Sequence, residues 1–237
     1  MKIYQTLYPM VTPSNPYRQR TPDRREIKEE KRLKRGAPMT MLNSPQHLTT
    51  KVRRTDCVLL VIDVQDRLID TIAEHGATVE NIKALIRAAR ILNVPVIATQ
   101  QENLGQIVPE LKDLLSNSPK FRKLNFSCCG DSVFMRKLRG VRKKTVIACG
   151  IETHICVLQT VLDLLTGGYH VLLVRDGTSS HALIDRETAI ERMRGAGAMT
   201  ETTEAVIYEL TARAGTEQFR KILEIVKERR SAYSPVS

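Results

Sequence analysis

Apolar and polar positions along the chain form two kinds of run. Short, continuous apolar runs rich in β-branched residues, such as 57–62 and 145–149, are typical of strands buried on both faces of a sheet. Longer runs with an apolar residue every three or four positions, such as 78–92, indicate amphipathic helices. The pattern predicts further strands within 94–99, 120–127, 169–174 and 198–201, and further helices within 107–115, 132–139, 153–166, 185–194, 203–213 and 217–227.

Strand and helix therefore alternate about six times between residue 51 and residue 230. Such alternation is typical of a mainly parallel sheet with helices on both faces. We predict an α/β fold, a three-layer α/β/α sandwich around a roughly six-stranded, Rossmann-like sheet. Residues 1–50 hold six of the ten prolines and no sustained apolar period, which predicts a basic, disordered extension. Residues 231–237 form a short tail after the domain at 51–230.

The formal net charge of +11 raises the question of a nucleic-acid partner. Residues 1–50 carry ten Lys and Arg against four Asp and Glu, so over half of the excess lies in the extension. The remainder shows no recognisable nucleic-acid motif, and we expect no nucleic-acid partner. No apolar run approaches the roughly 18 to 20 residues of a membrane span, so we expect no membrane partner either.

The N-terminus lacks the apolar segment of a secretory signal, which favours a cytoplasmic location. Lys2, Arg18 and Arg20 without any acidic residue before position 22 weakly resemble an organellar transit segment, so a mitochondrial location is the alternative if residues 1–50 are cleaved. Five cysteines without a Cys-x-x-Cys spacing predict reduced thiols. The five histidines lie far apart, and we expect no metal and no other cofactor.

Cys156 is the candidate reactive centre. It lies just beyond the strand predicted at 145–149, in or near the first turn of the helix predicted from residue 153. Unpaired backbone N–H groups and the helix dipole favour negative charge at such a place. This position predicts a lowered pKa for the Cys156 thiol and a nucleophilic sulfur.

Two charged residues are candidates for the same site. Asp63 closes the strand at 57–62, where partial desolvation makes a carboxylate a usable base, although an N-cap or turn role is the alternative. Lys123 lies in the segment KFRKLNFSCC, between Phe121 and Leu124, and an ammonium there would stabilise a thiolate; Lys120 and Arg122 compete for this role. Ligands of parallel sheets bind beyond the carboxyl ends of the strands, the edge predicted for Asp63, Thr99, Gly150 and Asp176.

These residues lie in segments that resemble the isochorismatase-like cysteine hydrolases, in particular the isochorismatase domain-containing proteins. LLVIDVQDRL resembles the first-strand motif that carries the aspartate of the family, KLNFSCC the segment that carries its lysine, and CGIETHICVLQTVLDLL the segment that carries its cysteine. The match runs from about residue 55 to residue 227 and selects Lys123 over Lys120.

The resemblance implies a hydrolase of small amide-like C–N bonds that works through a Cys156 thioester, with Asp63 as the base and Lys123 beside it. It also implies a cis peptide between Ile151 and Glu152, in a turn that extends to Thr153 and directs backbone N–H groups at the oxyanion. The candidates for the substrate pocket are Gln65, Gln100, Gln101 and Phe126.

The family also has members that this sequence does not match. Zinc-dependent nicotinamidases carry Asp-x-His after the second strand, where this chain has residues 99–105 (TQQENLG), so nicotinamidase activity is not expected. True isochorismatases lack the cysteine, which argues against cleavage of a vinyl ether. Family members commonly form homo-oligomers, and an apolar face on the last two helices would support a dimer or a larger assembly here.

Two other functions stay open at this stage. The chain would act as a catalytically silent adaptor if it kept the fold and bound partners through its basic extension. It would act as a redox-responsive thiol protein if Cys156 paired with Cys128 or Cys129. The joint presence of Cys156, Asp63 and Lys123 favours the enzyme, because a silent scaffold has no physical need for all three.

Overall fold

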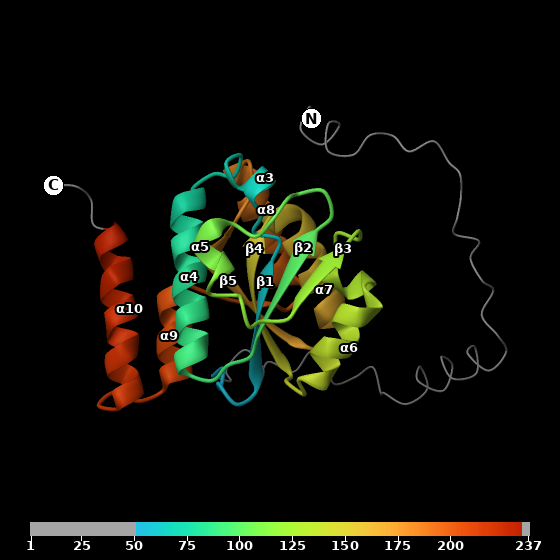
Figure 1. Ribbon diagram of the computed structural model, residues 1–237. Coiled ribbons are helices and arrows are strands. Elements are labelled where there is room, and N and C mark those ends of the chain that lie inside the picture. The colour runs from blue at the N-terminus through green and yellow to red at the C-terminus, as the bar shows by residue number, and fades with distance from the viewer. Residues whose placement is uncertain (1–50, 234–237) are drawn as a thin grey trace, which may run out of the picture. The chain divides into compact units, whose positions relative to one another are not determined.

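The computed structural model describes residues 51–233, so the predicted extension at 1–50 and residues 234–237 lie outside the described part. Six parallel strands form one sheet in the order β3-β2-β1-β4-β5-β6 (Figure 1). The strands are β1 (Cys57–Ile62), β2 (Val96–Gln101), β3 (Lys120–Lys123), β4 (Thr145–Ile151), β5 (His170–Ser179) and β6 (Met199–Glu201). The predicted α/β class and parallel sheet are confirmed.

Helices cover both faces of the sheet. One layer contains α4 (His75–Ile91), α9 (Thr203–Thr211) and α10 (Glu217–Tyr233), and the other contains α6 (Ser132–Gly140), α7 (Leu158–Thr166) and α8 (Leu183–Gly195) (Figure 1). Four short elements complete the described chain: α3 (Asp66–Ile69), α5 (Pro109–Lys112), the 3₁₀ turn η2 (Cys128–Gly130) and the π-helical turn η3 (Thr153–Val157). Within residues 51–233, no helix combines the length and the apolar character that crossing a membrane requires.

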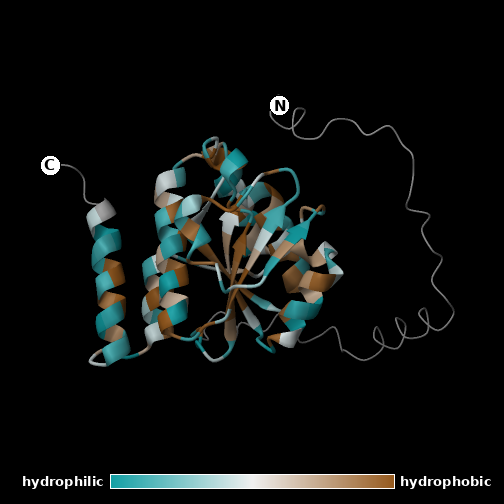
Figure 2. Cartoon of the chain, viewed as in Figure 1, coloured by the Kyte–Doolittle hydropathy of each residue, from teal (hydrophilic) through white to brown (hydrophobic). Residues whose placement is uncertain are grey.

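The core follows from the alternation of side chains along the buried strands. Every residue of β1 is buried, and alternate positions face opposite helical layers. Leu60 packs in one cluster with Val161 of α7 and Ile190 of α8, and Figure 2 shows the hydrophobic colour concentrated on the strands and the inward sides of the helices. Burial of this kind contributes about 25 cal/mol for each Å² of apolar surface removed from water.

The last two helices bury their apolar residues within the chain. Val206 and Ile207 of α9 and Ile222 and Ile225 of α10 are all at most 2% exposed, and α10 packs against α4 and α9. The apolar face that would have supported a contact between copies is therefore used for packing inside the chain. The hydrophobic periodicity of these helices reflects packing onto α4 inside one chain.

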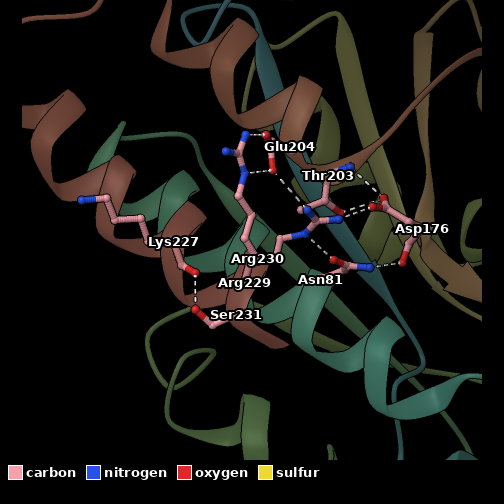
Figure 3. Close-up of polar contacts among 8 residues, drawn as sticks. All are labelled: Asn81, Asp176, Thr203, Glu204, Lys227, Arg229, Arg230 and Ser231. Carbon is pink, nitrogen blue, oxygen red and sulfur yellow. Dashed lines mark hydrogen bonds and ion pairs between the residues drawn. The ribbon is translucent and has the colours of Figure 1, made fainter. Parts of the chain in front are cut away.

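A polar network attaches α10 to the body of the domain (Figure 3). The Arg229 guanidinium contacts Asp176 at 2.7 Å and donates from Nε to Asn81 at 2.6 Å. Asp176 also accepts the backbone N–H and the hydroxyl of Thr203 at 2.7 and 2.8 Å. The expectation that Asp176 ends its strand at the ligand-binding edge is wrong, because β5 continues to Ser179 and this carboxylate anchors α9 and α10.

The strand order predicts a ligand-binding crevice between β1 and β4. These two strands are neighbours, and the chain proceeds from β1 toward β2 and β3 on one side and from β4 toward β5 and β6 on the other. In open parallel sheets, this reversal leaves a crevice at the carboxyl ends of the two central strands. Asp63 directly follows β1, and η3 follows β4 after a single residue.

Gly150 keeps these two strands close together. It has φ = +128°, and a Cβ built on it would lie 2.1 Å from the Ile62 carbonyl oxygen. We expect Gly150→Ala to lower the free energy of unfolding by about 3 kcal/mol or more, because it adds backbone strain to a clash that cannot relax without moving β1.

Gly197→Ala is the matched control in urea unfolding. Gly197 also has a positive φ, +106°, but no atom within 4 Å of the added Cβ, so this substitution measures the backbone cost alone. Equal losses of stability in the two variants would contradict the proposed contact between Gly150 and β1.

Candidate active site

Asp63 and Lys123 form a buried ion pair at the carboxyl edge of the sheet. Lys123 Nζ lies 2.6 Å from Asp63 Oδ2, and the two side chains are 1% and 0% exposed. Lys123 reaches the site because β3 ends there, two strands away from β1. Of the three basic residues that the sequence left open, Lys123 is the buried one, whereas Lys120 and Arg122 are exposed.

Backbone and side-chain oxygens complete the environment of the lysine. Its ammonium donates to Gln101 Oε1 at 2.7 Å and to the carbonyls of Phe126 and Asn125 at 2.9 and 3.2 Å. Burial acts to lower the pKa of Lys123, but the Asp63 carboxylate and the nearby Cys156 and Cys128 sulfurs outweigh burial and raise the pKa above its ordinary value. Lys123 is therefore a permanent cation at neutral pH.

Cys156 is the third member of the site and lies in η3, the turn that follows β4. It is the fourth residue of η3, and its side chain is buried with 6% of the residue exposed. Its thiol lies within electrostatic range of Asp63, Lys123 and Cys128. The structure thus brings together the thiol, the carboxylate and the ammonium that the sequence places 33 or more positions apart.

The predicted lowering of the Cys156 pKa is wrong. Burial raises the pKa of this thiol most strongly, and the Asp63 carboxylate raises it further, while the Lys123 ammonium acts in the opposite direction. At neutral pH the resting sulfur is therefore a neutral thiol that can donate its proton to Asp63.

Thr99 and Cys128 belong to the same site: Thr99 was expected at this edge of the sheet and Cys128 as a possible redox partner of Cys156, but neither was expected to contact Asp63 or its hydrogen-bond partners. The Thr99 hydroxyl donates to Asp63 Oδ1 at 2.8 Å, so both carboxylate oxygens are held. Cys128 Sγ lies 3.7 Å from the same hydroxyl oxygen. The sequence could have indicated the position of Thr99 through the alternation of side chains along β2. This alternation turns Thr99 and Gln101 toward the face that carries Cys156 and Lys123.

The four expected pocket residues have different environments. Gln65 accepts the backbone N–H of Gln101 at 2.8 Å and donates to the carbonyls of Gln101 and Gly105, both at 3.0 Å. Gln101 is engaged with Lys123 and with the Leu124 carbonyl, at 2.7 and 2.8 Å. These two amides brace the loops around the lysine, and their place in the substrate pocket stays a prediction.

Gln100 and Phe126 are the other two residues expected in the substrate pocket. Gln100 alternates with Thr99 and Gln101 along β2 and therefore points to the opposite face of the sheet, away from Cys156. Phe126 is 43% exposed, and its carbonyl accepts a hydrogen bond from Lys123. Of the expected pocket residues, Phe126 alone combines contact with the ion pair and a side chain exposed at the site's rim.

The turn before Cys156 is fixed by contacts to the end of β5. The peptide between Ile151 and Glu152 is cis, as the sequence resemblance implies. Glu152 accepts the backbone N–H of His181 at 2.8 Å, and the hydroxyls of Thr153 and Thr178 lie 2.8 Å apart. In the described part of the chain, no group of three or more His, Cys, Asp or Glu side chains is arranged to hold a metal ion.

Residues 57–205 match the family model of the isochorismatase domain. Secreted isochorismatase effector Isc1 of Phytophthora sojae is 37% identical over 177 residues, which cover 72% of this chain and 84% of that protein. Isochorismatase domain-containing protein 2A of Mus musculus is 35% identical over 175 residues, which cover 72% of this chain and 82% of that protein.

Solved structures with the same fold include the MAR1 ribonuclease from Caenorhabditis elegans, with a TM-score of 0.71, 36% identity, and coverage of 75% of this chain and 93% of that chain. YcaC from Pseudomonas aeruginosa, solved with hexane-2,5-diol and covalent acrylamide, has a TM-score of 0.71, 26% identity, and coverage of 78% and 98%. Escherichia coli YcaC, described as an octameric hydrolase of unknown specificity, has a TM-score of 0.70, 24% identity, and coverage of 79% and 98%.

Proposed function

Because this chain belongs to the isochorismatase family, we propose that it is a cysteine hydrolase that cleaves a small amide-like C–N bond. One observation carries the proposal: Asp63 pairs with Lys123 at 2.6 Å, and the buried Cys156 thiol lies close enough for both charges to act on it. A buried thiol with a carboxylate acceptor and a neighbouring cation has the composition of a base-activated nucleophile.

The proposed reaction begins with a neutral thiol. Asp63 takes the proton of Cys156 as the sulfur attacks the carbonyl carbon of the substrate. The C–N bond then breaks, the amine leaves with that proton, and a thioester remains on Cys156. Water gives a proton to Asp63 and attacks the thioester; the C–S bond breaks, the acid leaves, and the proton returns to the sulfur.

Lys123 and the turn before Cys156 support the charges of this reaction. Lys123 remains a cation, so it stabilises the sulfur as negative charge develops on it and keeps the carboxylate in place. We assign the developing oxyanion to backbone N–H groups of Cys156 and of the turn formed by Ile151, Glu152 and Thr153. One such donor typically lowers the barrier by about 3 kcal/mol.

Burial of the site supports a small substrate. Cys156 is 6% exposed, and the two charged partners are buried. A sulfur that is this buried is reached more readily by a primary amide or a ureide than by a polymer. We therefore propose a small-molecule substrate, although a solved relative is described as a ribonuclease.

We also propose that the chain forms a homo-oligomer. Leu124, Phe126, Leu183 and Ile184 expose between 42% and 72% of their surface. These residues follow β3 or begin α8, close to the carboxyl edge of the sheet, and such side chains are candidates for a contact between copies. E. coli YcaC, which shares the fold, is described as octameric.

A screen of small amides, ureides and carboxamides tests the proposed reaction. We expect at least one compound to release ammonia catalytically, and Cys156→Ala to reduce this release by about 1,000-fold or more because the covalent route is lost. Cys129→Ala is the matched control and should retain activity. Ammonia release that persists in Cys156→Ala would contradict the proposal, and a screen without turnover would favour the silent adaptor.

A further inference from the structure

The positive charge of the folded part is concentrated in one segment. Residues 120–144, which contain β3 and α6, carry nine Lys and Arg and one Asp. The rest of residues 51–237 carries 18 Lys and Arg against 21 Asp and Glu. A segment that opposes the charge of its surroundings in this way is a candidate for binding an anion.

A groove of about 1100 Å³ lies beside this segment. We call it the β3–α6 groove. Its apolar lining comes from the residues that lead into β2, from β3 and from both ends of α6: Val94, Pro95, Phe121, Val133 and Val141. This volume is slightly above the usual range of about 300 to 1,000 Å³ for small-molecule pockets, which are mainly apolar with a few polar groups.

The groove is separate from the candidate active site. Its strand residues lie at the amino ends of β2 and β3, whereas Asp63 and the end of β3 at Lys123 lie at the carboxyl edge. Because the strands are parallel, the two sites occupy opposite ends of the sheet. A ligand in the groove would therefore not contact Cys156.

Three cations border the apolar lining. Arg90 comes from the end of α4, and Arg136 and Lys137 come from the middle of α6. The residues that line the groove include Asn117 and Ser118 but no Asp or Glu. A carboxylate, sulfonate or phosphate would therefore meet cations and hydrogen-bond donors without an opposing carboxylate.

We propose that the β3–α6 groove binds a small anionic amphiphile, an apolar body that carries one anionic group. The apolar body lies against Val94, Pro95 and Val141, and the anionic group lies between Arg136, Lys137 and Arg90. Nucleic acid fits less well, because the one aromatic ring in the lining, Phe121, already packs edge-on against Phe134 at 5.9 Å. Proteins that bind single strands stack successive bases on several aromatic side chains, and this lining offers one ring.

Calorimetric titration of the full chain with dodecanoate, at concentrations below micelle formation, tests the proposal. We expect saturable binding of dodecanoate and none of dodecyltrimethylammonium, which has the same apolar body and the opposite charge. Arg136→Glu combined with Lys137→Glu should weaken dodecanoate binding at least about tenfold. Val133→Asp, an exposed change in the lining, should weaken it as well.

The matched control is Arg139→Glu combined with Lys144→Glu, which makes the same change in net charge on exposed residues of the same segment outside the groove lining. It should bind dodecanoate within about twofold of the unmodified chain. Equal losses in the two double variants would overturn the groove and indicate diffuse attraction to anions.

Two further arms distinguish other occupants. Binding of an oligouridine or of phosphatidylglycerol vesicles in the absence of dodecanoate binding would overturn the proposal in favour of a polyanion or a lipid surface. A change of sedimentation coefficient in Arg136→Glu with Lys137→Glu, again without dodecanoate binding, would assign the groove to a contact between copies. Circular dichroism of each variant confirms that the comparison concerns folded protein.

Discussion

Asp63→Asn is expected to reduce turnover of the best amide substrate by about 100-fold to 10,000-fold, the range typical of a lost general base. The resting Cys156 thiol is neutral, so turnover depends on a group that takes its proton. The Asp63 carboxylate lies within electrostatic range of this thiol and can take up its proton, whereas asparagine cannot. Initial-rate kinetics would measure the effect, with Asp70→Asn, an exposed change of the same chemistry nearby, as the control.

The same substitution should lower the pKa of the Cys156 thiol even though it slows turnover. The Asp63 carboxylate raises the pKa of Cys156, and its removal leaves Lys123, which lowers it. The pH at which alkylation of Cys156 becomes half-maximal should therefore fall in Asp63→Asn. A lower thiol pKa together with faster turnover would show that a preformed thiolate suffices and would contradict the role of Asp63 as base.

Lys123→Met is expected to lower the free energy of unfolding by about 3 to 5 kcal/mol, since removing one partner of a buried pair leaves an uncompensated charge. The Asp63 carboxylate would then be buried without the cation that now lies 2.6 Å away. Because the pKa of Lys123 is raised, the ion pair contributes fully below the ordinary lysine pKa of about 10.4 and is lost only as pH rises through the higher folded value.

Two further variants test whether the loss of stability in Lys123→Met comes from the broken ion pair. Lys120→Met, on the same strand but exposed, should cost less than about 1 kcal/mol in urea unfolding. Lys123→Met combined with Asp63→Asn should be more stable than Lys123→Met alone, because the buried charge is gone. Additive losses of stability in that double variant would argue against the pair as the source of the effect.

The regular part of the fold could be predicted from the sequence because buried parallel strands are continuous apolar runs. The run at 57–62 became β1 with the predicted bounds. The ends of β2 and β5 were predicted too early, at Thr99 and Val174, because both strands continue through polar residues. Pairing with neighbouring strands and contacts to helices hold those polar residues in the sheet, and a local pattern contains neither.

The sequence predicts the part of the candidate site that follows from where residues lie relative to the strands. Asp63 and Cys156 follow adjacent parallel strands, so their common edge follows from the fold class. The bracing amides of Gln65 and Gln101 and the hydroxyl of Thr99 depend on side-chain packing between segments. The sign of the Cys156 pKa shift depends on the balance of burial, carboxylate and ammonium, which is a property of the assembled site.

The order in which the cysteines react with acrylamide tests the proposed site most directly. Cys129 is more exposed than Cys156, and burial raises its pKa only to about 11, so exposure and acidity both favour Cys129. Peptide mass mapping during brief treatment at neutral pH would identify the first cysteine modified. We expect Cys156, because Asp63 takes its proton as the new C–S bond forms. Modification of Cys129 first, with Cys156 unreacted, would contradict activation of Cys156 by Asp63 and Lys123.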